Sequence, residues 1–174
     1  MGKEYEVSIL DIDVFDFEKR LNKLGAKKNG DFLQKRYVYD FNPEINNKWI
    51  RLRTNGKKTT ITIKEIFDES IVGGTNELEI EVSDFEKTNQ LLNELGYKEK
   101  GYQENKRTIY DIDEIEVSID SWPMIPTYAE IEGKNEKSVK EFLKRLNINE
   151  EKVTTLGVTS IYEAITLILN NMTF

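Results

Sequence analysis

The sequence predicts an α+β protein in which about eight strands close into one β-barrel with helices packed on its outside. Two observations predict this class. Segments of alternating polar and apolar residues recur along the chain, and a strand–helix–strand pattern occurs twice at a fixed offset. With 174 residues, the chain is long enough to bury a core without disulfides, and we expect a single domain over residues 1–174.

The repeat appears when the sequence is compared with itself at an offset of 71 residues, which aligns Tyr39 with Tyr110. The other matched positions are Leu21, Leu24, Gly25, Gly30, Lys35 and Arg36 with Leu92, Leu95, Gly96, Gly101, Lys106 and Arg107. A third, shorter copy begins at Glu130-Ile131-Glu132 and leads into another helical pattern. The fold is therefore predicted to consist of two pseudo-repeated strand–helix–strand halves with an additional C-terminal part.

Helices are expected at residues 14–24, 84–95, 136–146 and 160–169. Gly25 and Gly96 follow the first two, where a helix C-terminus favours a left-handed residue. Ser83 and Glu86 have capping-box spacing at the start of the second helix. The third helix has its apolar residues at helical spacing.

Strands are expected at residues 3–9, 33–41, 49–54, 57–67, 77–82, 104–111, 114–120 and 127–132. Asn55-Gly56 is a strong signal for a two-residue hairpin turn. That turn would place Arg53 opposite Lys58 and Arg51 opposite Thr60.

The alternation separates polar from apolar residues and also sorts the charges by strand. Cations gather on one face of the hairpin, at Arg51, Arg53, Lys58 and Lys64. Carboxylates gather on one face of the other segments, at Glu4, Glu6, Glu77, Glu79, Glu81, Glu116, Asp120, Glu130 and Glu132. One interpretation is a sheet whose charged face lies in water. The other is a barrel whose helix-covered outer face is apolar, so that acidic and basic walls face each other inside, an arrangement suited to a polyphosphate bridged to metal.

Composition excludes several classes of function. The net charge of -7 argues against nucleic-acid binding, which needs a basic surface. The chain has no cysteine and no histidine, so cysteine chemistry, Ser-His-Asp hydrolysis and histidine-based zinc sites are excluded. The N-terminus has no secretory pattern, and the longest apolar run near the C-terminus, residues 165–169, is too short to cross a bilayer. We expect a cytoplasmic protein with no membrane partner.

The chain resembles the CYTH superfamily, also called triphosphate tunnel metalloenzymes, which includes class IV adenylyl cyclases, thiamine triphosphatases and inorganic tripolyphosphatases. The ordered motifs that carry the resemblance are Glu4-x-Glu6, Arg51-x-Arg53, Lys64, Arg107, Asp120 and Glu130-x-Glu132. They extend over nearly the whole chain. The resemblance implies an eight-stranded antiparallel barrel that encloses a triphosphate-binding tunnel.

The resemblance also implies roles for individual residues. Arg51, Arg53, Lys64 and Arg107 would bind the triphosphate, and Glu4, Glu6, Asp120, Glu130 and Glu132 would hold Mg²⁺ or Mn²⁺. Glu4, Glu6, Lys64 and Asp120 would carry the catalytic step. Carboxylates suit hard divalent ions, and guanidinium groups suit phosphate oxygens. Lys35 and Arg36 are further triphosphate-binding candidates, and Glu79, Glu81 and Lys152 are additional site candidates, although parity does not settle which way Lys35, Arg36 and Lys152 face.

One departure from the family pattern concerns activity. The family signature is E-x-E-x-K, whereas this chain has Ser8 at the fifth position. The expected function is metal-dependent turnover of a small-molecule triphosphate such as ATP, thiamine triphosphate or tripolyphosphate, by a cyclase or a triphosphatase. The alternatives are a non-catalytic triphosphate-binding module, which Ser8 motivates, and a lipocalin-like barrel for an apolar ligand, which the charged inner faces argue against. The sequence is compatible with a monomer or a homodimer.

Overall fold

The computed structural model describes residues 1–163, which contain long antiparallel strands and three α-helices. The strands are β1 (Gly2–Ile9), β2 (Lys27–Asp40), β3 (Lys48–Thr54), β4 (Thr59–Ile66), β5 (Thr75–Val82), β6 (Glu99–Ile112), β7 (Ile115–Ser121), β8 (Tyr128–Gly133) and the short β9 (Val153–Thr154). The helices are α1 (Val14–Leu24), α2 (Phe85–Glu94) and α3 (Glu136–Leu146), followed by a 3-10 turn at Glu150–Lys152 and a helical segment at residues 158–163. The predicted helix at 160–169 therefore begins earlier than expected, and its remainder lies outside the described residues.

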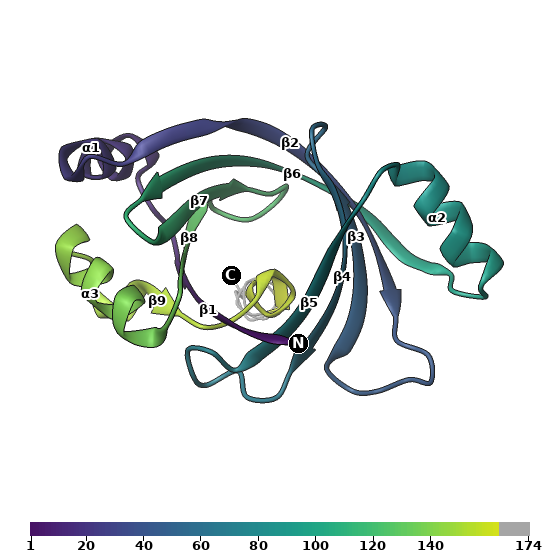
Figure 1. Cartoon of the computed structure of the whole chain (residues 1–174). Coiled ribbons are helices and arrows are strands. Elements are labelled where there is room, and N and C mark those ends of the chain that lie inside the picture. The colour runs from purple at the N-terminus through teal and green to yellow at the C-terminus, as the bar shows by residue number, and fades with distance from the viewer. Residues whose placement is uncertain (164–174) are drawn as a thin grey trace, which may run out of the picture.

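Strands β1 to β8 close into a barrel, which confirms the predicted fold class. The order β5-β4-β3-β2-β6-β7-β8-β1 is completed by pairing of β5 with β1 at Thr75–Glu77, and all of these pairings are antiparallel. Figure 1 looks into the ring of strands, with α1, α2 and α3 outside it. Within residues 1–163, no helix is long and apolar enough to cross a membrane.

The two halves of the repeat interlock through equivalent side chains. β2 and β6, the final strands of the two halves, pair with each other along most of their length. Tyr39 of β2 donates a hydrogen bond to Asn89 of α2, and Tyr110 of β6 donates one to Glu18 of α1, each at 2.7 Å. Both tyrosines and both acceptors are related by the same sequence offset. Each half therefore fastens the helix of the other half to the barrel.

Local signals define most helix boundaries, with one correction. Gly25 has a φ of 89° and Gly96 a φ of 90°, the left-handed conformation that glycine adopts without steric cost. The predicted capping box of Ser83 with Glu86 is wrong, because Asp84 is the N-cap of α2 and accepts a hydrogen bond from the Lys87 amide. An aspartate at this position satisfies the same free amide groups.

The predicted register of the β3–β4 hairpin is also wrong. Arg53 lies opposite Thr60 and Arg51 opposite Thr62, so the turn is centred one residue later than Asn55-Gly56. The Asn55 side chain accepts hydrogen bonds from the amides of Lys57 and Lys58, which stabilises this turn. The pairing shifts by two residues, and side chains on a strand alternate with a period of two, so the predicted faces are unchanged.

The apolar face of the barrel wall points outward and packs against helices. One cluster joins the outer faces of β1, β7 and β8 to Phe17 and Leu21 of α1 and to Phe142 and Leu146 of α3. A second, smaller cluster joins the outer faces of β2 and β3 to Leu92 of α2. Because alternate residues point the other way, the charged faces of the same strands line the interior.

Candidate functional site

The barrel interior contains a cavity of about 1150 Å³ that is lined largely by charged side chains. The candidate site residues that line it are Glu4, Glu6, Arg36, Arg51, Arg53, Lys64, Glu79, Arg107, Glu130 and Glu132. They come from seven of the barrel strands and converge because each stands on the inward parity of its strand. The charged faces therefore line the inside of the barrel, as the barrel interpretation requires.

The guanidinium groups are concentrated on β2, β3 and β6. Arg36 and Arg53 are directly opposite each other on neighbouring strands, and Arg51 lies two residues along β3. Proximity to Arg51, together with burial, lowers the pKa of Arg53 to about 10. Burial, followed by the effects of Arg51 and Arg107, lowers the pKa of Arg36 to about 9. Such crowding of like charges favours a polyanion in the cavity, because bound negative charge would relieve the repulsion.

Carboxylates accompany the cations on the same wall. Arg51 donates a hydrogen bond to Glu77 at 3.1 Å, and Arg51 and Arg53 lie 3.7 and 3.6 Å from Glu79. These glutamates project inward from β5, the neighbour of β4. The acidic and basic walls are therefore less separate than the sequence indicated, since β5 brings glutamates to the basic side.

A cluster of three carboxylates lies across the cavity. Glu4, Glu6 and Glu132 each place one oxygen within 4.8 Å of the others. Glu6 and Glu132 are register partners on β1 and β8, and Glu132 also pairs with Glu116 on β7. These hard oxygen donors from adjacent strands fit a divalent cation such as Mg²⁺ or Mn²⁺.

The protonation of this cluster reflects its surroundings. Burial, reinforced by Glu130 and Glu4, raises the pKa of Glu6 well above its ordinary value. Desolvation and then Glu4 raise the pKa of Glu132 to about 7, although its side chain keeps contact with solvent. Burial is the largest single influence on Glu4 and would raise its pKa, but Lys64, a hydrogen bond with Glu77 and the charge of Arg51 together outweigh burial, and the net shift is downward. The charge of Lys64 lowers the pKa of both Glu6 and Glu132 but does not offset these effects, and a bound cation would add the positive charge that the two side chains need.

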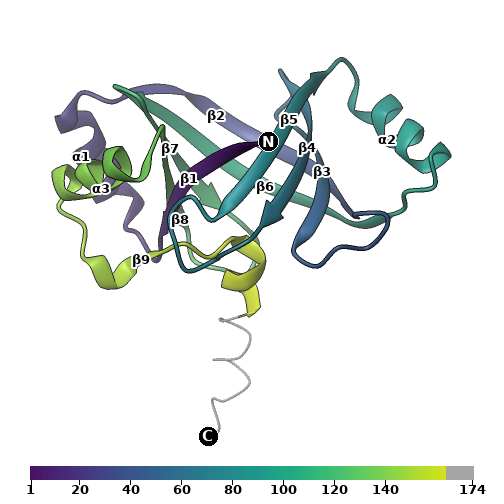
Figure 2. The same cartoon turned by 60° about the horizontal axis from the view of Figure 1, so that its bottom comes forward.

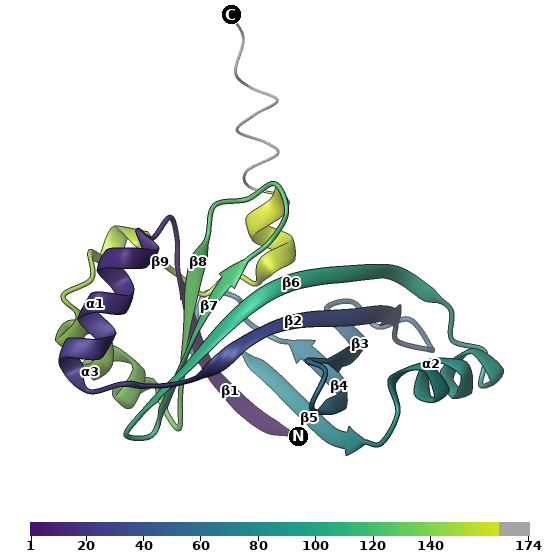
Figure 3. The same ribbon diagram turned by 90° about the horizontal axis from the view of Figure 1, so that it is seen from above.

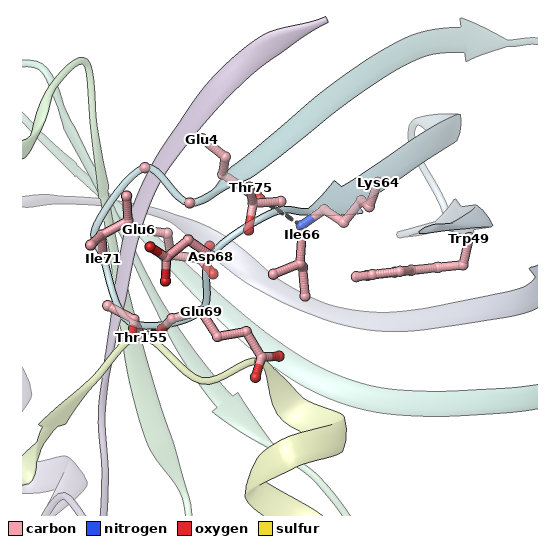
Figure 4. A pocket seen from close by; sticks show the side chains of 13 residues that line it. Glu4, Glu6, Trp49, Lys64, Ile66, Asp68, Glu69, Ile71, Thr75 and Thr155 are labelled. Carbon is pink, nitrogen blue, oxygen red and sulfur yellow. Dashed lines mark hydrogen bonds and ion pairs between the residues drawn. The ribbon is translucent and has the colours of Figure 1, made fainter. Parts of the chain in front are cut away.

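Lys64 connects the basic wall to this cluster. Its ammonium group lies 2.9 and 2.8 Å from the two oxygens of Glu4 and 3.5 Å from Glu77. Figure 4 shows this ion pair beside a small side pocket of about 80 Å³, which Glu6, Trp49 and the loop after β4 also line.

Asp120 and Glu130 are placed differently from the other predicted metal ligands. Arg107 donates to Asp120 from Nε at 2.9 Å, and its Nη2 contacts both Asp120 and Glu130. The two carboxylates raise the pKa of Arg107 despite the opposing effect of its burial. Asp120 is fully buried and also accepts a hydrogen bond from Asn105. The structure thus places Asp120 behind Arg107, where it orients the guanidinium, and outside the three-carboxylate cluster.

Three weaker candidates do not join the site. Lys35 is exposed on the outer face of β2, because its neighbour Arg36 takes the inward position. Lys152 is outside the barrel and contacts the Asp11 carbonyl at 2.8 Å. Glu81 is largely exposed, with Lys58 3.7 Å away. The first two assignments are therefore corrected, and Glu81 belongs to the rim of the barrel.

The cavity also contains residues that sequence reasoning did not select. Trp49, Glu77, Glu116 and Trp122 line it. The alternation places Glu77 and Glu116 on the same charged faces as the predicted site residues, but the family resemblance assigned them no role. For Trp122 the signal is tertiary, since its ring lies 4.5 Å from the Arg36 guanidinium in a cation–π contact.

The C-terminal part of the described chain covers one end of the cavity. The segment at 158–163 lies over that end of the barrel in Figures 2 and 3. Ile161 is buried against Trp122 and Tyr128, and Thr155 donates a hydrogen bond to the Glu69 carbonyl in the loop after β4. Gly157, Val158, Thr159, Ser160 and Glu163 line the cavity. This covering joins segments that are far apart in sequence.

Ser8 occupies the position at which the family signature has a lysine. It is buried on β1 between register partners Glu130 on β8 and Thr154 on β9, and its hydroxyl donates to the Leu156 carbonyl at 3.5 Å. The position therefore contributes no positive charge and instead contacts the segment that covers the cavity.

A closed antiparallel barrel with convergent arginines, a lysine and a carboxylate cluster inside defines a tunnel protein with a charged interior. Residues 2–156 match the family model of the CYTH domain, and the chain belongs to this family.

Similar proteins come from several organisms. The chain is 28% identical over 166 residues to "Putative adenylate cyclase MJ0240" of Methanocaldococcus jannaschii, covering 86% of this chain and 93% of that protein. The solved structure of the PH1012 protein from Pyrococcus horikoshii is 28% identical, with a TM-score of 0.76 over 88% of this chain and 96% of that one. A structure from Vibrio parahaemolyticus has a TM-score of 0.79 over 93% and 98% of the two chains at 11% identity, which shows likeness of fold alone.

Proposed function

We propose that this protein binds a small-molecule triphosphate inside the barrel and turns it over with the help of Mg²⁺ or Mn²⁺. The observation that carries the proposal is the convergence of Arg51, Arg53, Lys64 and Arg107 on a cavity that also holds the cluster of Glu4, Glu6 and Glu132. Guanidinium groups match phosphate oxygens in pairs, and the carboxylates supply the donors that hard cations prefer.

The chain's own residues suggest how a bound triphosphate would be activated. Arg51 and Arg53 are held by Glu77 and Glu79, so they are oriented before a ligand arrives. Arg107 is fixed in the same way by Asp120 and Glu130. Cations that are already in place stabilise negative charge developing on a leaving group without reorganisation. A divalent cation held by Glu4, Glu6 and Glu132 would supply Lewis-acid stabilisation of the phosphate oxygens.

Two reactions fit this arrangement. In a cyclase, the ribose 3′-hydroxyl of ATP attacks the α-phosphorus and pyrophosphate leaves. In a triphosphatase, water attacks the terminal phosphorus and orthophosphate leaves. The name of the Methanocaldococcus jannaschii relative, which shares 28% identity, favours testing the cyclase reaction first.

The test is to incubate purified protein with Mg²⁺ or Mn²⁺ and with ATP, thiamine triphosphate or tripolyphosphate in turn. Cyclic AMP with pyrophosphate would identify a cyclase, and orthophosphate a triphosphatase. An Arg51→Met variant should lose about 100-fold in kcat/KM, the scale of one lost transition-state contact. Failure of the wild-type protein to bind any triphosphate would end the proposal.

A second candidate is a triphosphate-binding module without turnover. Ser8 favours it, because this buried position holds a neutral hydroxyl that contacts the Leu156 carbonyl. Tight triphosphate binding without product would support this candidate. If a Ser8→Lys variant then gained turnover, the missing positive charge would be the cause.

A further inference from the structure

Glu4 takes part in two interactions that compete with each other. Both of its oxygens accept hydrogen bonds from the Lys64 ammonium, at 2.9 and 2.8 Å. One of its oxygens is also a member of the three-carboxylate cluster with Glu6 and Glu132. Only 12% of each side chain of the Glu4–Lys64 pair is exposed, so little solvent competes for either partner. Glu4 therefore links the cluster that suits a cation to a lysine that suits phosphate.

The remaining cluster members have no such link. Among the described residues, neither Glu6 nor Glu132 forms a hydrogen bond or ion pair with a cationic side chain. After burial, the largest influences on the pKa of Glu6 are the charges of Glu130 and Glu4, both of which raise it. A divalent cation would satisfy these two glutamates without breaking a salt bridge, and Glu4 is the one member that must give up a partner.

The charged residues that line the cavity affect how a triphosphate can bind there. Of the described residues that line it, eleven carry carboxylates and eight carry lysine or arginine. Lys64, Arg51, Arg53 and Arg107 each already contact at least one carboxylate. A free triphosphate, with its high negative charge, therefore meets a cavity in which carboxylate-bearing residues outnumber the cationic ones and the cations are already engaged.

We propose that Glu4 makes the tunnel selective for a triphosphate in its metal-complexed form. With a divalent cation held by Glu4, Glu6 and Glu132, the Glu4 carboxylate would no longer engage Lys64, and the Lys64 ammonium group would become available to a phosphate oxygen. Metal and triphosphate binding thus reinforce each other through one side-chain exchange, and each must tighten the other by the same factor. This inference rests on the proposed function and adds the form of ligand that the site accepts.

The test measures binding and does not depend on turnover. Diimidotriphosphate, a tripolyphosphate analogue with NH bridges that resist hydrolysis, is titrated calorimetrically into each protein in EDTA and in Mg²⁺. Wild-type protein should bind the analogue at least about tenfold more tightly in Mg²⁺ than in EDTA. The Glu4→Gln variant should bind it about tenfold more tightly than wild type in EDTA, because Lys64 then keeps only its longer contact with Glu77 at 3.5 Å, and should gain little from Mg²⁺.

Glu6→Gln is the matched control. It makes the same substitution on the same strand and in the same cluster, but Glu6 does not hold Lys64. It should lose the gain from Mg²⁺ without improved binding in EDTA. Equal binding of the analogue by Glu4→Gln and Glu6→Gln in EDTA would overturn the inference and leave the proposed function intact. Absence of binding by every protein in Mg²⁺ would overturn both.

A second pair of variants covers the case in which Glu4→Gln fails to fold. Lys64→Met should bind Mn²⁺ more tightly than wild type without any triphosphate, as followed by electron paramagnetic resonance, because Glu4 no longer has a competing partner. Arg53→Met removes an equal charge from the same cavity, but its carboxylate neighbour is Glu79 and not Glu4. Equal tightening in the two variants would show a general charge effect and overturn the exchange.

Discussion

The barrel wall formed by β7, β8 and β1 is covered by two helices, whereas the wall formed by β3, β4 and β5 is covered by one. Figure 1 shows α1 and α3 together on one side and α2 alone on the other. Behind the helix pair, outward residues such as Val117 and Ile131 are fully buried. On the other wall, Leu78 and Ile80 of β5 are 48% and 57% exposed. The repeat supplies each half with one helix, and only the C-terminal addition of α3 completes the cover on one side.

The inner faces of the two walls differ as well. The doubly covered wall carries the carboxylates Glu6, Glu116 and Glu132, and the singly covered wall carries Arg51 and Arg53. Like charges crowd on both inner faces, but Arg51 and Arg53 are paired with glutamates of β5, whereas the carboxylates on the other wall raise one another's pKa. The packing on the apolar outer face of a wall and the charges on its inner face are therefore related. The best-packed wall supports the carboxylate cluster.

The largest difference is expected in the loss of stability when either of two isoleucines, each at the centre of an E-x-E segment, is replaced by alanine. Ile131 lies between Glu130 and Glu132 with no exposed surface, and Ile80 lies between Glu79 and Glu81 with 57% of its surface exposed. Ile131→Ala should lower the free energy of unfolding by about 2–5 kcal/mol, because it leaves a cavity under α3. Ile80→Ala should cost less than about 1 kcal/mol. Urea unfolding measures both, and similar losses would contradict the comparison.

A smaller effect is expected from the two tyrosines that fasten the helices. Tyr39→Phe removes the bond to Asn89 of α2, and Tyr110→Phe removes the bond to Glu18 of α1. Each should cost about 1 kcal/mol, the usual net value of such a bond. The two helices lie on opposite sides of the barrel (Figure 1), so the double variant should show the sum of the two losses. A clearly non-additive double variant would show that the walls unfold as one coupled unit.

The sequence predicted the barrel and the inner faces because both follow from local periodicity. A period of two fixes which residues share a face whatever the strand order, so Glu4 and Glu6 or Arg51 and Arg53 could be assigned together. The predicted faces of the β3–β4 hairpin are correct although the predicted turn is wrong, because a shift of two residues preserves the faces.

The rest of the site depends on contacts between distant segments, which periodicity does not encode. Which carboxylate lies near which cation follows from strand order, so the Glu4–Lys64 pair and the placement of Asp120 behind Arg107 could not be read from spacing. The neighbours Lys35 and Arg36 necessarily face opposite ways, but only the barrel shows that Arg36 is the inward one. The closing of one end by residues 158–163 has no local signal.

The smallest expected effect concerns how the melting temperature depends on pH when one glutamate from each wall is replaced by glutamine. It is measured by thermal unfolding in EDTA. The pKa of Glu132 is raised from its model-compound value of 4.5 to about 7, so its neutral form favours the folded state. Its contribution to stability is present below about pH 4.5 and is lost as the pH rises through 7. Glu132→Gln keeps the neutral form, so this variant should melt a few degrees above wild type at pH 8 and close to it at pH 4.5.

Glu79 should show the opposite sign. Burial by itself would raise its pKa, but the hydrogen bond from Thr62 and the charges of Arg53 and Arg51 outweigh burial and lower it. Its ionised form therefore favours folding, and this contribution is lost only as the pH falls through the lowered pKa. Glu79→Gln should melt below wild type at pH 8, with the difference shrinking in acid. If both variants shifted in the same direction at pH 8, the inner faces of the two walls would not differ electrostatically as the structure indicates.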